Sequence, residues 1–325
     1  MTGSTTDVNS TEADGASGGI RVRVPAKVNV QLAVGGLRPD GFHGLANIFL
    51  AVGLHDTVTA SPSETDGVTL SASGPFARRV PLDGTNLAAR AARLLAERHG
   101  LGEPRVRLHI AKDIPIAGGM AGGSADAAGA LVACDALWGT GTPREELLEM
   151  CAELGSDVPF SLLGGAALGQ GRGELLTPLV TGGAFHWVFA VADGGLSTPA
   201  VYRECDRLRE EEGTGADVAA VPEPEPSAAV VEALASGDAR ALAAALTNDL
   251  QAAAVSLRPA LADTLAAGTA AGALAGIVSG SGPTCAFLTG DAESATAVAE
   301  ALVASGTCRA AYPATGPAPG ATLLG

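Results

Sequence analysis

The stretch of sequence that decides the fold is PIAGGMAGGSADAAGAL, residues 115–131. The alternating segment Val106–Ile110 before it predicts a strand, and the apolar run from Ala125 to Trp138 predicts a helix. A glycine-rich turn between them lets backbone N–H groups approach an anion closely, while the helix dipole stabilises negative charge. This pattern favours a phosphate-binding loop, in which Ser124 could also reach a metal ion. The alternative, glycines that only permit a tight turn or close helix packing, stays open.

This loop matches neither of the common nucleotide-binding motifs. The spacing from Gly118 to Gly123 is that of a P-loop, but Ser124 stands where that motif has Lys, and G-x-G-x-x-G is missing. A phosphate site still needs a cation, and the chain has only two lysines, Lys27 and Lys112, among 20 basic residues. Lys27 lies in the apolar pattern PAKVNV, where burial is unfavourable without an anionic partner, so it is a candidate for function. A surface-facing strand lysine is the alternative.

A carboxylate suited to acid–base chemistry lies in the segment GSDVPF, residues 155–160. Asp157 stands there between a flexible glycine and an apolar Val-Pro-Phe step, which could hold it in a partly dry pocket. Such an Asp could pair with Lys27 and accept a proton from a hydroxyl group. Asp is also common at helix N-caps, so capping of the next short helix is the alternative role.

The composition limits the class of protein. Of 325 residues, 47% are apolar and 17% charged, which is typical of a packed globular chain and excludes disorder for its bulk. With 35 acidic and 20 basic residues the net charge is −15, which disfavours nucleic-acid and anionic membrane partners. Five scattered cysteines without metal-ligand spacing predict reduced, mostly buried thiols. Because no transmembrane, signal or transit segment is found, we expect a cytoplasmic protein.

The rest of the chain predicts strands and helices in an α+β arrangement. Two short strands separated by Pro25 and further β structure over 45–60 and 67–72 precede a helix from Asn86 to His99. A capping box over Thr142–Glu145 starts the next helix, which ends near Gly155. Strands at 165–179 and 185–192 lead to an acidic, proline-bearing stretch at 210–226. Ala-rich helices over 227–246, 259–271 and 292–304 then alternate with strands at 274–278, 284–288 and 309–312.

Four blocks of the sequence together resemble the GHMP kinases: PAKVNVQLAVGGLRPDGFH (25–43), PIAGGMAGGSADAAGAL (115–131), LGSDVPFSLLGGAALGQGRGE (154–174) and IVSGSGPT (277–284). The resemblance runs from about Arg21 to Tyr312. It implies a two-domain α+β GHMP-kinase fold with the active site in the cleft between the domains. We therefore expect a disordered tail over 1–19, an N-terminal ATP-binding domain over 20–178, a C-terminal α+β substrate-side domain over 179–313 and a tail over 314–325.

The resemblance also implies a catalytic pair and a nucleotide site. Asp157 matches the residue that takes the proton of the acceptor hydroxyl, and Lys27 matches the one that orients Asp157 and balances developing charge. ATP is expected with Mg²⁺ nearby, and Ser124 is a candidate ligand of the ion. The residues that match the ATP-binding motif are Pro115, Gly118, Gly119, Met120, Ala121, Gly122, Gly123 and Ser124.

The segments PAKVNV, RPDGFH and GSDVP indicate the branch of the family that phosphorylates a small cytidyl substrate. Asn29 matches a polar residue that contacts this substrate, and His43 matches one that hydrogen-bonds the cytosine edge. Phe42 and Tyr202 match two aromatic residues on the faces of the base. A homoserine- or mevalonate-type kinase is the first alternative, but an aromatic sandwich has no purpose for a small aliphatic alcohol. A non-catalytic metabolite-binding protein is the second, and the retention of Lys27 and Asp157 argues against it.

The sequence departs from the family pattern at a few positions. Phe42 stands where Tyr is usual, which keeps a stacking face but removes a hydroxyl group. Ala117 and Ala121 replace usual loop glycines, so we expect that neither site uses a positive φ. Asp126 stands where Asn is frequent, and it could face Mg²⁺ or serve the N-terminus of the helix. The other histidines, His55, His99, His109 and His186, are expected to be structural or surface residues.

Overall fold

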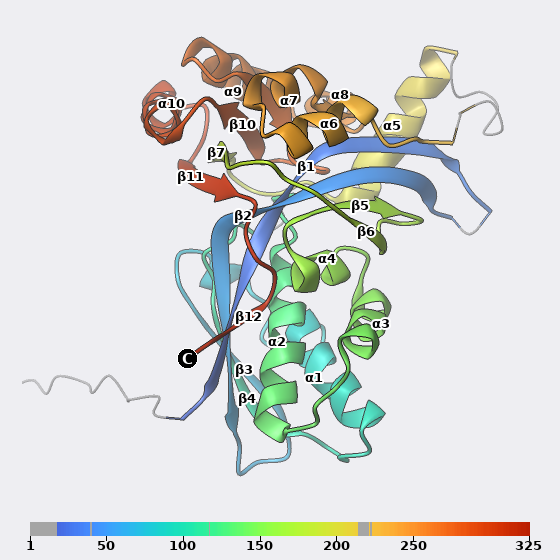
Figure 1. The fold of residues 1–325 in the computed structure, drawn as a ribbon, viewed down its shortest axis with the longest axis vertical. Coiled ribbons are helices and arrows are strands. Elements are labelled where there is room, and N and C mark those ends of the chain that lie inside the picture. Colours follow the sequence, from blue (N-terminus) through green and yellow to red (C-terminus); the bar gives the residue numbers. More distant parts are fainter. Residues whose placement is uncertain (1–17, 40, 117, 214–220, 222) are drawn as a thin grey trace, which may run out of the picture.

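Two β-sheets with helices packed around them make up the fold (Figure 1). The computed structural model describes residues 18–39, 41–116, 118–213, 221 and 223–325. Most of the tail expected over 1–19, position 117, and residues 214–220 and 222 of the acidic stretch lie outside the described residues. The α+β class expected from the sequence is confirmed, whereas the domain boundaries stay a prediction.

The first sheet holds eight strands. They are β1 (Ile20–Leu37), β2 (His43–Pro62), β3 (Gly67–Ser73), β4 (Arg105–Ala111), β5 (Ala166–Gln170), β6 (Leu175–Leu179), β8 (Thr247–Asn248) and β12 (Thr322–Leu324). The order along the sheet is β12-β1-β2-β4-β3, with β5 pairing β2 and β6, and β8 pairing β1. The second sheet, in the order β11-β7-β10-β9, is formed by β7 (Phe185–Val191), β9 (Ala275–Val278), β10 (Cys285–Thr289) and β11 (Ala310–Gly316).

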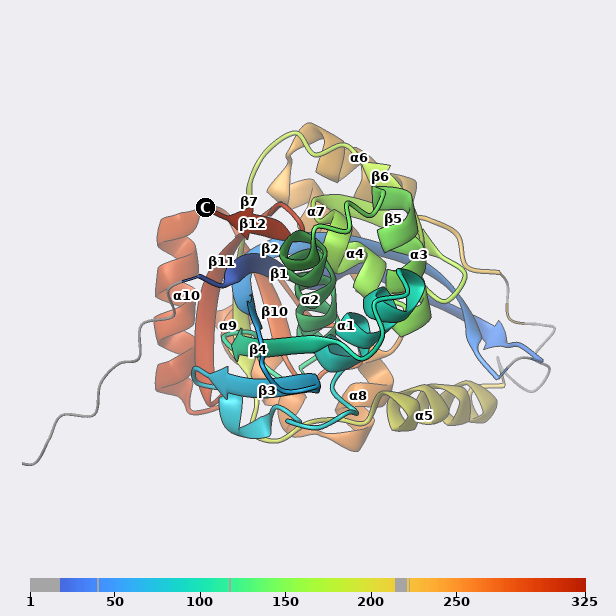
Figure 2. The same ribbon diagram turned by 90° about the horizontal axis from the view of Figure 1, so that it is seen from below.

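The helices form two groups. Helices α1 (Leu87–Arg98), α2 (Gly122–Trp138), α3 (Arg144–Leu154) and α4 (Val158–Leu163) gather on one side of strands β1 to β4 (Figures 1 and 2). A short 3₁₀ turn, η1 (Ala77–Arg79), follows β3. Helices α5 (Thr198–Glu211), α6 (Ala228–Ser236), α7 (Ala239–Ala245), α8 (Gln251–Leu257), α9 (Ala260–Ala270) and α10 (Ala292–Ser305) lie with the second sheet at the other end of the molecule (Figure 1).

The long antiparallel hairpin of β1 and β2 carries one wall of the site described below. Val22, Val24, Val28 and Val30 are fully buried, as their alternation along the sequence predicts. The two short strands expected around Pro25 are in fact one strand. Pairing with β2 shifts register between Pro25 and Ala26 and then continues, because proline has no N–H to donate and the sheet absorbs this as a local irregularity.

Small side chains bring α2 close to the sheet. Ala127, Ala128 and Ala130 are fully buried, and a Cβ at Gly129 would lie 2.8 Å from the side chains of Val24 and Val58. Only a helix lined with Ala and Gly can approach a strand so closely. Since the glycine-rich turn forms the N-terminus of α2, this packing holds the turn beside β1.

The capping box expected at Thr142 is wrong. Pro143 is the N-cap of α3, which has no side-chain capping bond. Thr142 is engaged elsewhere, because its Oγ1 lies 2.9 Å from Nε2 of His99 and its backbone N–H donates to the Asp135 carboxylate. The end of α3 at Gly155 agrees with the prediction.

Two predictions for the C-terminal part also need correction. The helix expected over 227–246 is broken at Gly237, which has φ 72°, and the Asp238 side chain caps the second piece by accepting bonds from the N–H groups of residues 240 and 241. Residues 314–325 are not a tail, because β11 continues to Gly316 and β12 pairs antiparallel with β1. A strand this short shows too little alternation of apolar and polar residues to be recognised in the sequence.

The five cysteines are unpaired and four of them are buried, as expected from the sequence. In the described part of the chain, every helix is too short or too polar to cross a membrane.

Candidate active site

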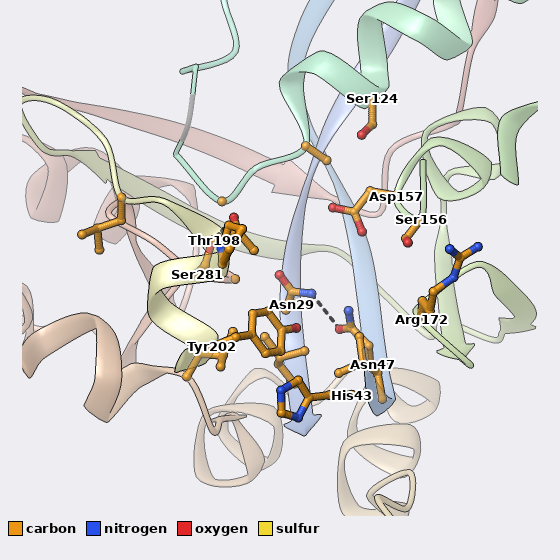
Figure 3. A pocket seen from close by; sticks show the side chains of 18 of the residues that line it. Asn29, His43, Asn47, Ser124, Ser156, Asp157, Arg172, Thr198, Tyr202 and Ser281 are labelled. Carbon is orange, nitrogen blue, oxygen red and sulfur yellow. Dashed lines mark hydrogen bonds between the residues drawn. The ribbon is translucent and has the colours of Figure 1, made fainter. Parts of the chain in front are cut away.

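A cavity of about 820 Å³ lies where β1, β2, the glycine-rich turn, the segment before α4, α5 and the turn after β9 meet (Figure 3). Nearly all residues predicted for the site line it. They are Lys27, Asn29, Phe42, His43, Pro115, Gly118, Gly119, Ala121, Gly122, Gly123, Ser124, Asp157 and Tyr202. Met120 does not line it, because its side chain is fully buried in the core.

Lys27 is held in the interior of β1. Its side chain is 6% exposed, and its Nζ donates to Oδ1 of Asn29 at 2.5 Å and lies 4.0 Å from Oδ2 of Asp157. Lys27 and Asn29 are two positions apart on one strand, so they share a face of the sheet. Burial lowers the pKa of the Lys27 ammonium group, and the Asp157 carboxylate raises it in part. The surface-facing alternative for this lysine is therefore wrong.

Asp157 occupies the N-cap position of α4, but its side chain makes no capping bond. Two local features fit this: Asp157 has φ −89° and ψ −9°, whereas a capping residue is normally extended, and Pro159 at the second helical position has no N–H to donate. The carboxylate turns into the cavity instead, with its side chain 36% exposed (Figure 3). The sequence placed the helix start correctly, while the capping role that it offered as the alternative is wrong.

The glycine-rich turn is locked between β1 and the turn after β9. The backbone N–H of Lys27 donates to the Met120 carbonyl at 3.3 Å. Gly119 has φ 74°, and a Cβ there would lie 1.9 Å from the Ser279 carbonyl oxygen, so only glycine fits. The Ser279 hydroxyl donates to the Gly119 carbonyl at 3.1 Å. The segment SGSGPT thus acts as a support for the turn.

The expectation that Ala121 avoids a positive φ is wrong. With φ 59° and ψ 29° it is left-handed, and it is the only non-glycine residue of the described chain with a positive φ. Its carbonyl accepts the N–H of Ala125 at 2.8 Å, which starts α2. Left-handed backbone destabilises alanine by about 1–2 kcal/mol, an amount that the surrounding contacts of the turn can offset.

Aromatic side chains gather at one end of the cavity. The rings of His43 and Tyr202 are stacked, with centroids 5.2 Å apart and an interplanar angle of 28°. Nδ1 of His43 lies 2.9 Å from the Gly35 carbonyl oxygen, and because a carbonyl only accepts, this nitrogen carries a proton. Nε2 faces Oδ2 of Asp206 at 3.4 Å. Phe42 is half exposed at the edge of the cavity.

The sequence did not indicate three of the polar residues of the cavity. Asn47 accepts a hydrogen bond from Nδ2 of Asn29 at 2.7 Å and is 4% exposed. A buried amide within the apolar run ANIFLAV was the signal that could have found it. Arg172 and Asp206 had no such signal, because they stand in polar segments. The four histidines expected to be structural, His55, His99, His109 and His186, do not line the cavity.

Asp126 does not line the cavity but belongs to a buried cluster beneath the glycine-rich turn. Lys112 Nζ donates to Asp126 Oδ2 at 2.5 Å, to Asp56 Oδ2 at 2.6 Å and to the Gly122 carbonyl at 2.8 Å. Burial raises the pKa of the Asp126 carboxyl well above its usual range, and Asp56 adds to the rise while Lys112 opposes it. Oδ1 of Asp126 has no hydrogen-bond partner among the described residues. Asp126 thus serves neither of the two roles considered for it.

Comparison with known proteins identifies relatives of this arrangement. Residues 86–165 match the family model "GHMP kinases N terminal domain", and residues 230–307 match "GHMP kinases C terminal". A 4-diphosphocytidyl-2-C-methyl-D-erythritol kinase of Streptomyces avermitilis is 70% identical over 305 residues, which cover 94% of this chain and 99% of the relative. The crystal structure of a 4-(cytidine 5'-diphospho)-2C-methyl-D-erythritol kinase is similar with a TM-score of 0.71 at 33% identity, covering 94% of this chain and 99% of the other. A homoserine kinase from Cytophaga hutchinsonii, with a TM-score of 0.70 at 19% identity, covers 98% and 100% and shares the fold.

Proposed function

The chain belongs to the GHMP kinases and, within them, to the 4-diphosphocytidyl-2-C-methyl-D-erythritol kinases, and from this premise we propose how its residues carry out the reaction. It is an ATP-dependent kinase that phosphorylates the C2 hydroxyl of 4-diphosphocytidyl-2-C-methyl-D-erythritol, in non-mevalonate isoprenoid precursor biosynthesis. The roles of the individual residues are the proposal.

We infer that Asp157 is the base of the phosphoryl transfer. The C2 oxygen of the substrate forms a bond to the γ-phosphorus of ATP while the bond from that phosphorus to the β,γ-bridging oxygen breaks, and the hydroxyl proton moves to a carboxylate oxygen of Asp157. The observation that carries this role is the Asp157 carboxylate, left without a capping bond and 4.0 Å from the Lys27 ammonium group. Lys27, bound to Asn29 at 2.5 Å, orients the carboxylate and stabilises charge that develops on the transferred group.

The glycine-rich turn is the proposed site of the ATP phosphates. It presents the N-terminus of α2 to the cavity, where backbone N–H groups and the helix dipole favour negative charge. Gly118, Gly119, Ala121, Gly122, Gly123 and Ser124 form this wall, and Pro115 borders it. Met120 contributes through the backbone, because its carbonyl is bonded to the N–H of Lys27.

The residues present also fit a magnesium ion. The hydroxyl of Ser124 and the carboxylate of Asp157 point into the same part of the cavity (Figure 3). The described chain has no cluster of three or more His, Cys, Asp or Glu side chains placed to hold a metal ion. Mg²⁺ at a phosphoryl-transfer site needs only one or two protein ligands besides phosphate oxygens and water, so such a cluster is not required. When bound, Mg²⁺ would neutralise charge on the phosphates, with Ser124 as the proposed ligand.

We propose that the other end of the cavity binds the cytosine. Tyr202 and Phe42 would stack on its two faces, and His43 would contact its edge through Nε2, because Nδ1 is bonded to Gly35. Asn29, linked to Asn47 at 2.7 Å, lies between the two ends and would contact the methylerythritol moiety. The grouping of Phe42, His43 and Tyr202 in the cavity lining supports this assignment, since a small aliphatic acceptor gains nothing from aromatic rings.

The test is a comparison of acceptors in an assay of ADP release. We expect turnover with 4-diphosphocytidyl-2-C-methyl-D-erythritol and none above background with homoserine or mevalonate. The similarity to a homoserine kinase, at 19% identity, reflects the fold alone. Turnover of either small alcohol at a rate comparable with the cytidyl compound would contradict the assignment of the aromatic end.

A further inference from the structure

The mechanism above gives no role to two arginines that line the cavity, Arg172 and Arg203. Arg172 lines the cavity from the turn between β5 and β6. Its Cζ lies 5.3 Å from the centre of the Phe42 ring, which places the guanidinium over that ring. The side chain is 41% exposed, so it remains open to the cavity and to solvent.

Glu174 fixes the backbone of Arg172 more firmly than its side chain. A carboxylate oxygen of Glu174 accepts the backbone N–H of Arg172 at 2.7 Å, whereas the other lies 3.5 Å from Nε of the guanidinium, at the limit of a hydrogen bond. Within the described part of the chain, the two terminal nitrogens of the guanidinium have no hydrogen-bond partner. A guanidinium presents planar pairs of N–H donors that match phosphate oxygens, and here those donors are available.

Arg172 contacts a residue at one end of the cavity and points toward the other end. It is stacked on Phe42, at the end proposed for cytosine, while its guanidinium points toward the side of Ser156 and Asp157 (Figure 3). In the substrate, a diphosphate joins the cytidine to the methylerythritol moiety. If the base lies at Phe42 and the acceptor hydroxyl lies at Asp157, the diphosphate must pass between them.

We propose that Arg172 binds the diphosphate of the acceptor substrate through its terminal guanidinium nitrogens, with the Ser156 hydroxyl as a second donor. This inference rests on the proposed function, since it needs the cytidyl substrate in the orientation described above. The same guanidinium supports the Phe42 ring from one side, so a single residue both steadies the stacking surface and recognises the charge that follows the base. Lys27 is not available for this purpose, because it is bonded to Asn29 and paired with Asp157.

Two alternatives to this proposal make different predictions. In the first, Arg172 only supports the Phe42 ring. Its replacement would then weaken the binding of the base alone, and the Kd values for cytidine and cytidine 5'-diphosphate would rise by the same factor. Alternatively, Arg203 on α5, an exposed residue that also lines the cavity, could be the cation that meets the diphosphate. The ratio of the Kd for cytidine to the Kd for cytidine 5'-diphosphate separates these cases, because the two probes differ only in the diphosphate.

The experiment measures both Kd values by NMR titration, with a non-hydrolysable ATP analogue and Mg²⁺ filling the nucleotide site. For Arg172→Gln we expect the Kd of cytidine 5'-diphosphate to rise about tenfold and that of cytidine to change less than twofold. Arg172→Lys should recover part of the loss, because it keeps the charge without the planar donors. Phe42→Ala should weaken both probes together and leave their ratio unchanged.

Arg105→Gln is the matched control, because Arg105 is an exposed arginine on β4, paired with Asp66 and outside the cavity lining. Equal weakening of both probes by Arg172→Gln, no change in either, or a loss of the diphosphate preference in Arg203→Gln instead would overturn the inference. A wild-type protein that binds neither probe and phosphorylates homoserine or mevalonate would overturn the proposed function itself. Because the wild type is measured first, the two failures are distinguishable.

Discussion

Nζ of Lys27 lies 4.0 Å from Oδ2 of Asp157, and the two partners differ sharply in exposure: 6% for the lysine side chain and 36% for the aspartate. The lysine is fixed by its bond to Asn29, while the carboxylate is open to the cavity. A buried cation beside an accessible carboxylate is the arrangement that a proton-accepting aspartate needs, because the charge of the carboxylate is stabilised while the group stays open to the substrate.

Asp157→Asn should abolish turnover while ATP still binds. The amide keeps the shape of the side chain but cannot accept the proton of the C2 hydroxyl, and the loss of one positioned acid–base group lowers the rate by about 10²- to 10⁴-fold. Steady-state kinetics together with a titration of ATP would check both parts. Turnover within threefold of the wild type would remove Asp157 from the mechanism.

Lys27→Met should lower kcat more than it weakens the binding of either substrate. The ammonium charge is needed mainly while phosphoryl transfer proceeds, and methionine retains the length of the buried stem. Comparing kcat and KM for both substrates measures the effect. A change in KM alone, with kcat preserved, would reassign Lys27 to binding of the ground state.

Tyr202→Ala should raise KM for the cytidyl substrate by about ten- to a hundredfold and leave KM for ATP nearly unchanged. The expected loss is the stacking of one aromatic ring on the base, worth roughly 1–3 kcal/mol, and about 1.4 kcal/mol corresponds to a factor of ten. The measurement is KM for each substrate in the same assay.

Tyr202→Phe is the control for that prediction, since it keeps the ring and removes only the hydroxyl group, and it should change little. Tyr202 also packs partly against the second hydrophobic cluster, so a purely structural role is a real competitor. In that case Tyr202→Ala would lower the Tm and raise KM for both substrates equally, and the base-stacking assignment would have to be abandoned.

Asp126→Asn should stabilise the protein, and the gain should grow with pH. Burial raises the pKa of this carboxyl in the folded state above its unfolded value of about 3.9, so the folded state binds the proton more tightly. The stability that this proton provides is fully present below the unfolded pKa and is lost as the pH rises through the folded pKa. Each unit by which the pKa is raised corresponds to about 1.4 kcal/mol that the charged form loses at high pH. Asparagine does not ionise, so it avoids this loss.

Thermal unfolding of the variant and the wild type between pH 4 and pH 8 checks the sign. The difference in Tm should be smallest near pH 4 and increase toward pH 8. Because Lys112 keeps its bond to Asp56 at 2.6 Å, the lysine is not left without an anionic partner in the variant. A variant that becomes less stable than the wild type as the pH rises would show that the charged Asp126 is needed to pair with Lys112.

Local signals in the sequence were sufficient where one segment determines its own structure. The helix after Asn86, the strand–turn–helix unit around Gly118 and the end of α3 at Gly155 depend on caps, glycines and short-range periodicity. Predictions failed where a distant contact competes with the local rule. Thr142 does not cap α3, because it contacts His99 and Asp135 instead. Pro25 does not end β1, because β2 continues to pair on both sides of it.

The sequence by itself determined the chemical groups of this protein: two lysines, a GSDVPF aspartate, a glycine-rich turn and the aromatic residues, in blocks whose order identifies the family. The sequence also indicated Lys27 as the lysine of the site, whereas only the tertiary structure decided what each of the two lysines contacts. Lys27 and Lys112 are both buried, but β1 directs the first toward Asp157, whereas the second is bonded to Asp56 and Asp126 beneath the turn. The tertiary structure likewise brought Arg172 onto Phe42 and Asn47 onto Asn29. These contacts join residues far apart along the chain, and pairings of that kind depend on the register of the sheet and the packing of α2, which no local pattern encodes.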